Sequence, residues 1–324
     1  MWAAVGSGDN EPVTNRPRTA DTRGGGRPVA SRQQERHWRE DGWCVLEGVI
    51  PGDELLAAQR AVARLFPTAA QMRAPGGDGD ARWRTWDAPW PEFPFRSRTL
   101  NALAVGGTLI GLARQLIGVD DVRMYLAIAT AKYGGQPSDY NQLLHTDFPN
   151  HTLTVPRPEA GFHQMETFVY LCDVDEGNGA TRFVSRARTA GIPVERHTLD
   201  YEEFAALYDD GGDASAPAGS IVVYRPDVYH RSVDFADPDR ARFMLHVSYR
   251  GAAVEWGGYQ AWPFKGFSME WHAFVEQATP EQLTVLGFPA PGHPYWNEAT
   301  LAGVGRRYPG LDLAPWRQAM GAHR

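Results

Sequence analysis

The sequence predicts a mainly β fold with flanking helices, arranged as a sandwich or jelly roll after a helical prelude. From Val122 onward, short runs rich in β-branched and aromatic residues follow one another, and loops and turns separate them. These runs are VRMYLAIATAKY, NQLLHTDF, METFVYLCDV, GSIVVYRPDVYHRSV and RARFMLHVSYR. Upstream, apolar residues recur instead at helical spacing, which predicts helices that pack on the strands.

The prelude begins with a strand-like run, Trp43–Ile50, which a Pro-Gly-Asp break ends. Asp53 is placed to cap a helix whose apolar residues extend to Phe66. A second helical pattern covers residues 100–117 and is interrupted by two glycines. Residues 69–97 between these helices are expected to form a loop, and its length indicates function or mobility.

That loop ends in an aromatic, proline-rich portion with two alternative interpretations. Its arginines and tryptophans can meet a planar or acidic substrate, or they can pack as a scaffold. The residues concerned are Arg82, Trp83, Arg84, Trp86 and Trp90.

Two helix starts are predicted after the strands begin. Residues 200–208, DYEEFAALY, form a short insertion that we expect to be helical. Thr279 precedes a proline and a glutamate, and proline suits the first position of a helix.

The chain is large enough for a sizeable core, with 324 residues of which 43% are hydrophobic. Length alone favours about two domains, but β folds of this size often form one. We expect a disordered polar tail over residues 1–31 and a single domain over residues 32–324. Within the domain, the β core covers about residues 120–250, and an aromatic-rich extension of helices and loops covers residues 251–324.

Composition excludes several classes of partner. The net charge is −7 without a basic stripe, so no nucleic-acid partner is expected. No apolar run reaches about 18 residues, so no membrane span is expected. The N-terminus lacks a basic segment followed by an apolar one, which favours a cytoplasmic location over a secreted one. Cys44 and Cys172 lie in apolar runs and are expected to be buried free thiols, with a disulfide as the alternative.

The stretch LLHTDFPNHTL places His145 and Asp147 two residues apart in a run that has the character of a buried strand. Burying a carboxylate is costly unless it is paired or holds a metal. On a strand the two side chains share one face. His230 follows another strand and an RPD turn, and two imidazoles with one carboxylate are the ligand set of non-haem Fe(II) oxygenases. Alone the pattern is weak, because the chain has ten histidines.

An arginine near the start of the last strand adds a second feature. Arg240 and Arg242 precede the apolar run FMLHVSY, and an arginine fork suits the far carboxylate of a dicarboxylate ligand. Ser232 is two residues past His230 and points the same way, so it can give a further hydrogen bond. The alternative is a surface arginine at a strand end.

Five segments in this order resemble the phytanoyl-CoA dioxygenase family of Fe(II)/2-oxoglutarate-dependent oxygenases, from about Glu35 to Tyr249. They are HWREDGWCVLEGVIPGDEL, HTDF, FVYLCDVDEGNGATRFV, PAGSIVVYRPDVYHRSV and DRARFMLHVSY. The resemblance implies a double-stranded β-helix, the cupin-like jelly roll. It also implies Fe(II), 2-oxoglutarate and O₂ as the reacting partners of the protein.

The resemblance also assigns roles. It makes His145, Asp147 and His230 the iron ligands. It makes Arg242, seven residues before Tyr249, the arginine for 2-oxoglutarate, with Arg240 as the fallback and Ser232 as its helper. Phe168 falls where the family often has a tryptophan beside the cosubstrate; a plain core aromatic is the alternative. Gln142 and Lys132 can face the pocket or be structural, and His151, His163 and His246 are further pocket candidates.

The implied function is oxidation of an unactivated C–H bond of a small-molecule substrate, with release of succinate and CO₂; hydroxylation is expected, and desaturation, epoxidation and cyclisation stay open. Asp147 disfavours halogenation, because related halogenases carry a small residue there. The abundance of Ala, Gly, Arg and Asp suggests natural-product biosynthesis. Two alternatives stay open: a non-catalytic binding protein, and a cupin-like metal protein without a cosubstrate. The sequence leaves the substrate and the oligomeric state undetermined.

Overall fold

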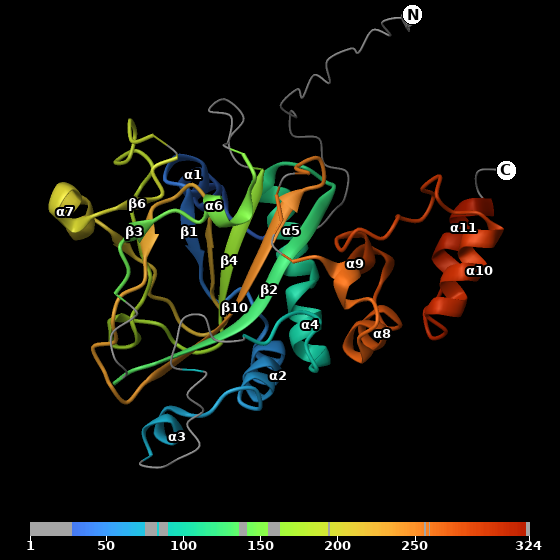
Figure 1. Ribbon diagram of the computed structural model, residues 1–324, viewed down its shortest axis with the longest axis horizontal. Helices are drawn as coiled ribbons and strands as arrows, with labels where there is room; N and C mark the ends of the chain where they lie inside the picture. The colour runs from blue at the N-terminus through green and yellow to red at the C-terminus, as the bar shows by residue number, and fades with distance from the viewer. Residues whose placement is uncertain are drawn as a thin grey trace, which may run out of the picture.

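Two five-stranded antiparallel sheets pack against each other in the computed structural model, which describes residues 28–74, 83, 90–135, 141–154, 163–193, 195–255, 257–258 and 260–321 (Figure 1). The first sheet has the order β1-β8-β4-β10-β2, with strands Trp43–Leu46, Ile221–Tyr224, Gln164–Tyr170, Ala241–Gly251 and Val122–Tyr133. The second has the order β6-β3-β9-β5-β7, with strands Thr198–Leu199, Leu144–His145, His230–Arg231, Arg182–Phe183 and Gly212–Asp213. This arrangement confirms the predicted jelly-roll class.

Alternation along β10 decides which side chains reach the space between the sheets. Phe243, Leu245, Val247 and Tyr249 belong to the large core on the outer face, whereas Met244 joins the cluster between the sheets. Successive side chains on a strand point to opposite faces. Arg242, His246 and Ser248 therefore share the inner face with Met244. β10 pairs with β2 on one side and β4 on the other, which fixes the inner-face residues of all three strands.

Helices cover the outer face of the first sheet. α4 (Arg98–Ala104) and α5 (Gly107–Ile117) lie alongside β2 in Figure 1, with α2 (Gly52–Val62) next to α4. The predicted interruption falls between α4 and α5. Glycine is required at Gly106, because a Cβ there would lie 2.9 Å from the carbonyl oxygen of Ala102. α2 ends four residues before Phe66, so it is shorter than predicted.

One 20-residue stretch of the described chain, Arg98–Ile117, is long and apolar enough to cross a membrane. It comprises two helices rather than one, and 61% of its most apolar 18-residue window is buried inside the protein. Buried core helices of globular proteins are often equally long and apolar, so length and composition are weak evidence for a membrane span here.

The N-terminal region begins with α1 (Arg32–Glu40), which Ser31 caps together with Gln34. Ala30 is buried, and its N–H donates to Gln115 Oε1 at 2.9 Å. The last residues of the predicted tail are therefore packed on α5, while residues 1–27 lie outside the described part of the chain.

The predicted loop over residues 69–97 contains a helix, α3 (Ala69–Arg73), so the prediction was wrong there. Thr68 and Gln71 form a reciprocal capping box, which stabilises this short turn of helix. Trp83 and Trp90 stack on each other at 5.6 Å, and both contact Phe66. These tryptophans pack as a scaffold on the outer face; Arg82, Arg84 and Trp86 lie outside the described residues.

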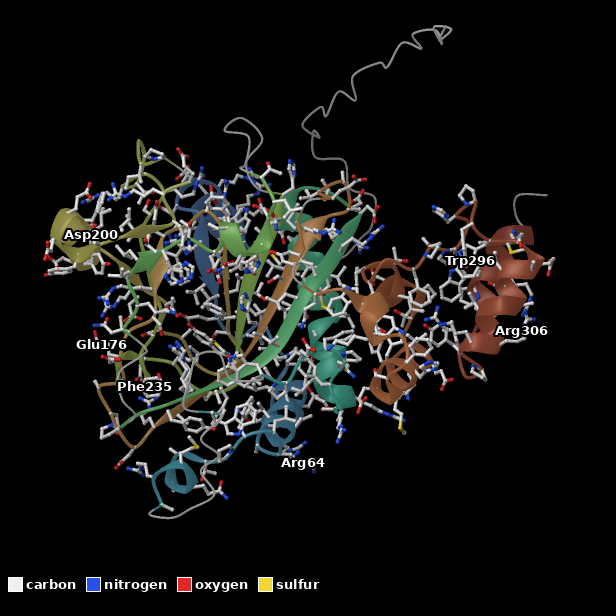
Figure 2. The ribbon with its side chains drawn as sticks, viewed as in Figure 1. Arg64, Glu176, Asp200, Phe235, Trp296 and Arg306 are labelled. Carbon is white, nitrogen blue, oxygen red and sulfur yellow. The ribbon has the colours of Figure 1, made fainter. Side chains whose placement is uncertain are left out.

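The C-terminal extension contains η3 (Trp262–Lys265), α8 (Met269–Val275), α9 (Pro280–Thr284), α10 (Glu298–Arg307) and α11 (Ala314–Gly321). Thr279 caps α9, and Pro280 is its first residue, as predicted. The backbone N–H of Met124 on β2 donates to Val285 O at 2.8 Å, and the indole of Trp262 donates to Met124 O at 3.1 Å. Trp296, labelled in Figure 2, contacts Trp316 at 5.6 Å and holds α11 in place.

Two smaller predictions are also confirmed. α7 (Tyr201–Asp209) occupies the predicted helical insertion and is capped by Asp200. Cys44 and Cys172 are both free thiols, although Cys172 is only partly buried.

Candidate active site

Strand pairing brings His145 and His230 together. They are direct partners across β3 and β9, and their ring centroids are 4.5 Å apart. Each Nδ1 lies about 3 Å from the backbone carbonyl two residues upstream, at 2.9 Å from Leu143 O and 3.0 Å from Val228 O. A carbonyl oxygen only accepts, so Nδ1 carries the proton in both rings. Both Nε2 atoms are therefore left with a lone pair for a metal.

Asp147 reaches the same place through a turn rather than a strand. β3 ends at His145, and the Asp147 backbone is helical, with φ −86° and ψ −15°, at the start of α6 (Phe148–His151). The N–H groups of Asp147 and Phe148 both donate to Pro226 O, at 3.0 and 2.9 Å. Asp147 thus lies just after the strand, in a helical turn that these long-range bonds and Pro149 favour, and the strand-like run forms a strand only as far as His145.

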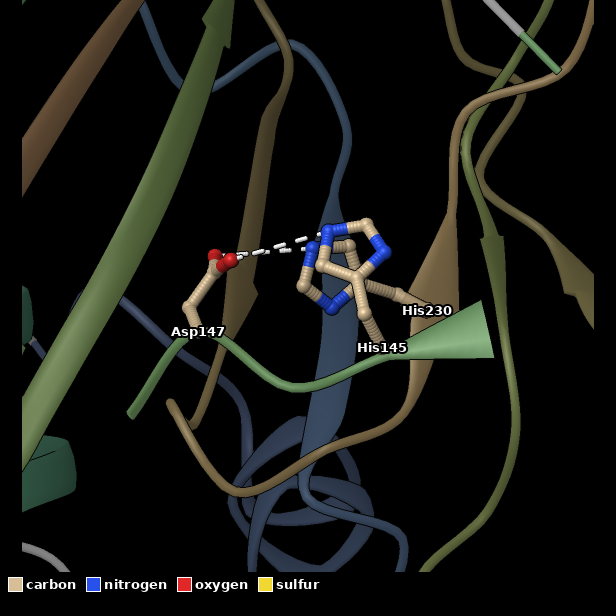
Figure 3. A group of neighbouring side chains, drawn as sticks. All are labelled: His145, Asp147 and His230. Carbon is tan, nitrogen blue, oxygen red and sulfur yellow. Dashed lines mark ion pairs between the residues drawn. The ribbon is translucent and has the colours of Figure 1, made fainter. Parts of the chain in front are cut away.

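The three side chains form a compact ligand cluster (Figure 3). Asp147 Oδ1 is 3.7 Å from His145 Nε2, and Oδ2 is 3.4 Å from His230 Nε2. All three ligand atoms lie within 4.8 Å of one another, and no other such cluster of three occurs in the described part of the chain. Burial lowers the pKa of His145, with a further contribution from His230. Burial raises the pKa of Asp147, but the imidazoles of His230, His151 and His145 outweigh it and keep the pKa below its ordinary value.

These groups fit Fe(II). A non-haem iron site uses two neutral imidazoles, each with a free Nε2 lone pair, and one ionised carboxylate as its donors. The carbonyls that fix both imidazoles supply the outer contacts typical of metal-binding histidines.

Arg242 lies at one end of the interior, with only 2% of its surface exposed. Its Nη1 donates to the carbonyl of Gly179, and the guanidinium lies over the ring of Phe235, labelled in Figure 2, at 5.9 Å. Gly179 ends the short 3₁₀ helix η2 (Glu176–Asn178) with φ +70°, and a Cβ there would lie 2.5 Å from Val233 O. Arg240, by contrast, is partly exposed and pairs with Asp175 at 2.5 Å.

A second cation lies beside Arg242. Lys132 is its cross-strand partner on β2, and its ammonium donates to Ser232 Oγ at 2.5 Å. Burial lowers the pKa of Lys132 well below its ordinary value, and the charge of Arg242 lowers it further. An anionic ligand beside Arg242, Lys132 and the Ser232 hydroxyl would offset this repulsion and favour the charged form of Lys132, so this buried space suits an anion. Gln142 braces Ser232: its Oε1 accepts from the Ser232 N–H at 3.2 Å, and its own N–H donates to Ser232 O.

Phe168 lies on the inner face of β4, in the cluster between the sheets. Its ring centroid is 5.1 Å from that of Tyr224 and 5.1 Å from that of His246. His163 immediately precedes β4, and its backbone carbonyl accepts a hydrogen bond from the N–H of Gly251.

Sequence reasoning missed a buried carboxylate, Glu166, which lies on β4 next to the metal cluster. It is fully buried, and four donors surround it. Oε1 faces the hydroxyl of Tyr125 and His151 Nδ1, which is 3.2 Å away. Oε2 faces His246 Nε2 at 3.0 Å and the hydroxyl of Ser248. The signal was available in the sequence, because METFVY places a charged residue in an apolar strand.

The charges around Glu166 favour an ionised Glu166 carboxylate paired with a protonated His151. Burial raises the pKa of Glu166, but His151 and His246 outweigh it and hold the pKa far below its ordinary value. Burial lowers the pKa of His151, but Glu166 reverses this and raises the pKa to about 9. Two of the three histidines that sequence analysis left as pocket candidates, His151 and His246, thus belong to one network.

Tyr224 connects this network to the metal cluster. It is the cross-strand partner of Glu166, and its hydroxyl donates to Asp147 Oδ2 at 2.7 Å. Its ring also lies 4.9 Å from that of His230. Sequence reasoning did not single out Tyr224, because nothing in IVVY distinguishes it from a core residue.

Comparisons with known proteins agree with this geometry. No curated protein matches the chain. The solved structures that are similar in fold include EctD from S. alaskensis with bound Fe, at 19% identity and a TM-score of 0.54, covering 74% of this chain and 82% of that one. They include the non-heme alpha ketoglutarate dependent carbocyclase SnoK from nogalamycin biosynthesis, at 18% identity and a TM-score of 0.50, covering 71% and 88%. HygX from Streptomyces hygroscopicus, with nickel and 2-oxoglutarate bound, has 17% identity and a TM-score of 0.50, covering 72% and 96%.

Sequence family models give a more specific result than the fold. The model for phytanoyl-CoA dioxygenase matches residues 38–237, which is more than half of the chain and contains all three residues of the metal cluster. The chain therefore belongs to the phytanoyl-CoA dioxygenase family and is a dioxygenase that uses iron and 2-oxoglutarate.

Proposed function

We propose that this dioxygenase hydroxylates an unactivated C–H bond of a small molecule in natural-product biosynthesis, releasing succinate and CO₂. The convergence of His145, Asp147 and His230 carries the proposal, because these three residues would hold the iron. Bound iron and 2-oxoglutarate supply the oxidising chemistry, and the residues of this chain bind, orient and shield the reactants.

The far carboxylate of 2-oxoglutarate would bind at Arg242. The burial of Arg242 and its neighbours Lys132 and Ser232 supports this choice over Arg240, which already pairs with Asp175 near the surface. Gln142 would act through Ser232, because it braces the backbone on both sides of that residue. Phe168 would pack beside the cosubstrate on the inner face of β4.

The substrate would lie on the opposite side of the metal from Arg242. At a rise of roughly 3.3 Å per residue, Arg242 and Ser248 are separated by about 20 Å along β10. Asp147 contacts Tyr224, whose cross-strand partner Glu166 is in turn paired with Ser248. The metal cluster is thus nearer the Ser248 end, and the cosubstrate fills the space toward Arg242. His246 would then face the substrate.

Natural-product biosynthesis is supported by the fold similarity to SnoK and by the composition of the chain. The complete ligand set together with Arg242 argues against a non-catalytic binding protein, which would be free to lose one of these residues. A metal protein without a cosubstrate would not need Arg242 or Ser232.

Succinate formation tests the proposal. Purified protein is supplied with Fe(II), ascorbate and 2-oxoglutarate, with and without extracts of small molecules, and succinate is quantified by mass spectrometry. We expect succinate to require Fe(II) and to fall at least tenfold in Asp147→Ala and His230→Ala. Asp210→Ala is the control, because Asp210 pairs with Arg188 on the surface. Undiminished succinate in both ligand variants would refute the proposal.

A further inference from the structure

The hydroxyl of Tyr224 donates a hydrogen bond to one of the two carboxylate oxygens of Asp147. The Oη–Oδ2 distance is 2.7 Å, and Tyr224 is fully buried. Its ring is fixed by Phe183 at 5.2 Å, by His230 at 4.9 Å and by Phe168. The hydroxyl therefore has little freedom to leave the carboxylate.

A carboxylate can bind a metal through one oxygen or through both. Six-coordinate iron with two imidazoles and one carboxylate oxygen keeps three positions, which 2-oxoglutarate and O₂ need together. Binding through both oxygens of Asp147 would remove one of these positions.

Resting on the proposed function, we propose that Tyr224 is a positioning residue that holds Oδ2 of Asp147 and so confines the metal to Oδ1. The hydroxyl thereby preserves a coordination position for the reaction.

Of the two carboxylates near the Tyr224 hydroxyl, Asp147 is the one that can accept its hydrogen bond. Glu166 is the other carboxylate nearby, but Tyr125, His151, His246 and Ser248 already supply it with four donors. A carboxylate offers about four lone-pair sites, so Glu166 is saturated.

Tyr224→Phe removes the hydroxyl and keeps the ring. The matched control is Tyr170→Phe: Tyr170 is on the same sheet and in the same buried cluster, and its hydroxyl donates to Ala214 O at 2.9 Å, away from the metal cluster. Each variant loses one buried hydrogen bond, and thermal unfolding shows whether both remain folded.

Mn(II) is the probe, because the relaxation rate of water protons reports how many waters a bound Mn(II) ion carries. We expect Tyr224→Phe to weaken Mn(II) binding by about tenfold or more. Relaxivity per bound ion should fall by about one third, since two bound waters replace three. Tyr170→Phe should match the wild-type protein in both measurements.

Unchanged relaxivity in Mn(II)-saturated Tyr224→Phe would overturn the proposal, whatever the affinity. An equal loss in Tyr170→Phe would also overturn it, because the effect would then come from general loosening of the core. Failure of the wild-type protein to bind Mn(II) would instead overturn the proposed function, and this inference with it.

Discussion

Glu166→Gln is expected to be among the most damaging conservative substitutions in this protein. The change keeps the shape but removes the charge, and it turns one oxygen into an NH₂ group that faces two donors. His151 then loses the anion that raises its pKa to about 9. Removing one partner of a buried charge pair costs about 3–5 kcal/mol, so we expect a loss of that size in the free energy of unfolding.

The pH dependence provides a separate signature. The pKa of His151 is raised in the folded protein from 6.5 to about 9, so the stability that it contributes is fully present below pH 6.5 and is lost as the pH rises through about 9. This contribution is on the order of 3 kcal/mol. The pKa of Glu166 is lowered in the folded protein, so the stability that Glu166 contributes is present above its pKa in the unfolded chain and is lost at acidic pH.

Urea unfolding of metal-free protein at pH 6 and pH 9 measures both effects. The wild-type protein should lose stability between these values, whereas Glu166→Gln should start lower and lose much less. Glu281→Gln is the control, because Glu281 is about half exposed and pairs with Arg114, a surface pair worth less than about 1 kcal/mol. A loss below about 1 kcal/mol in Glu166→Gln, with the wild-type slope against pH, would refute the reasoning.

Three further outcomes are expected. Arg242→Met should weaken 2-oxoglutarate binding in calorimetry by roughly 30- to 4,000-fold, the equivalent of about 2–5 kcal/mol, while Arg240→Met changes it only slightly; equal effects would contradict the assignment. Trp83→Ala should cost about 3–5 kcal/mol of stability without weakening 2-oxoglutarate binding, and the opposite pattern would place Trp83 in the pocket. Cys44, whose pKa burial raises to about 12, should resist iodoacetamide at pH 8 until urea unfolds the protein; rapid labelling in the folded state would contradict its burial.

Alternation and turn chemistry made much of this fold predictable. Four of the five apolar runs contain strands of the first sheet, whereas NQLLHTDF gives only the two-residue β3 of the second sheet. Thr279 and Asp200 capped the helices expected of them, and the glycine break separated α4 from α5. These features depend on local sequence. The helix α3 was missed because its capping box, Thr68 and Gln71, lies in a stretch without apolar periodicity.

The site was less predictable, because its geometry depends on contacts far apart in the chain. Asp147 is placed by bonds to Pro226, which no local pattern reveals. Glu166 and Tyr224 read as parts of apolar strands, and only the pairing of β4 with β8 places them beside the metal cluster. Gln142, expected either to face the pocket or to be structural, contacts Ser232.

Anaerobic titration of the protein with Fe(II) in the presence of 2-oxoglutarate tests whether these three ligands hold one iron. The chelated complex absorbs visible light through metal-to-ligand charge transfer, and the band should saturate at one Fe(II) per chain. His145→Ala and His230→Ala should abolish it at the same concentrations. A band of wild-type intensity and stoichiometry in either variant would contradict the assignment of iron to His145, Asp147 and His230.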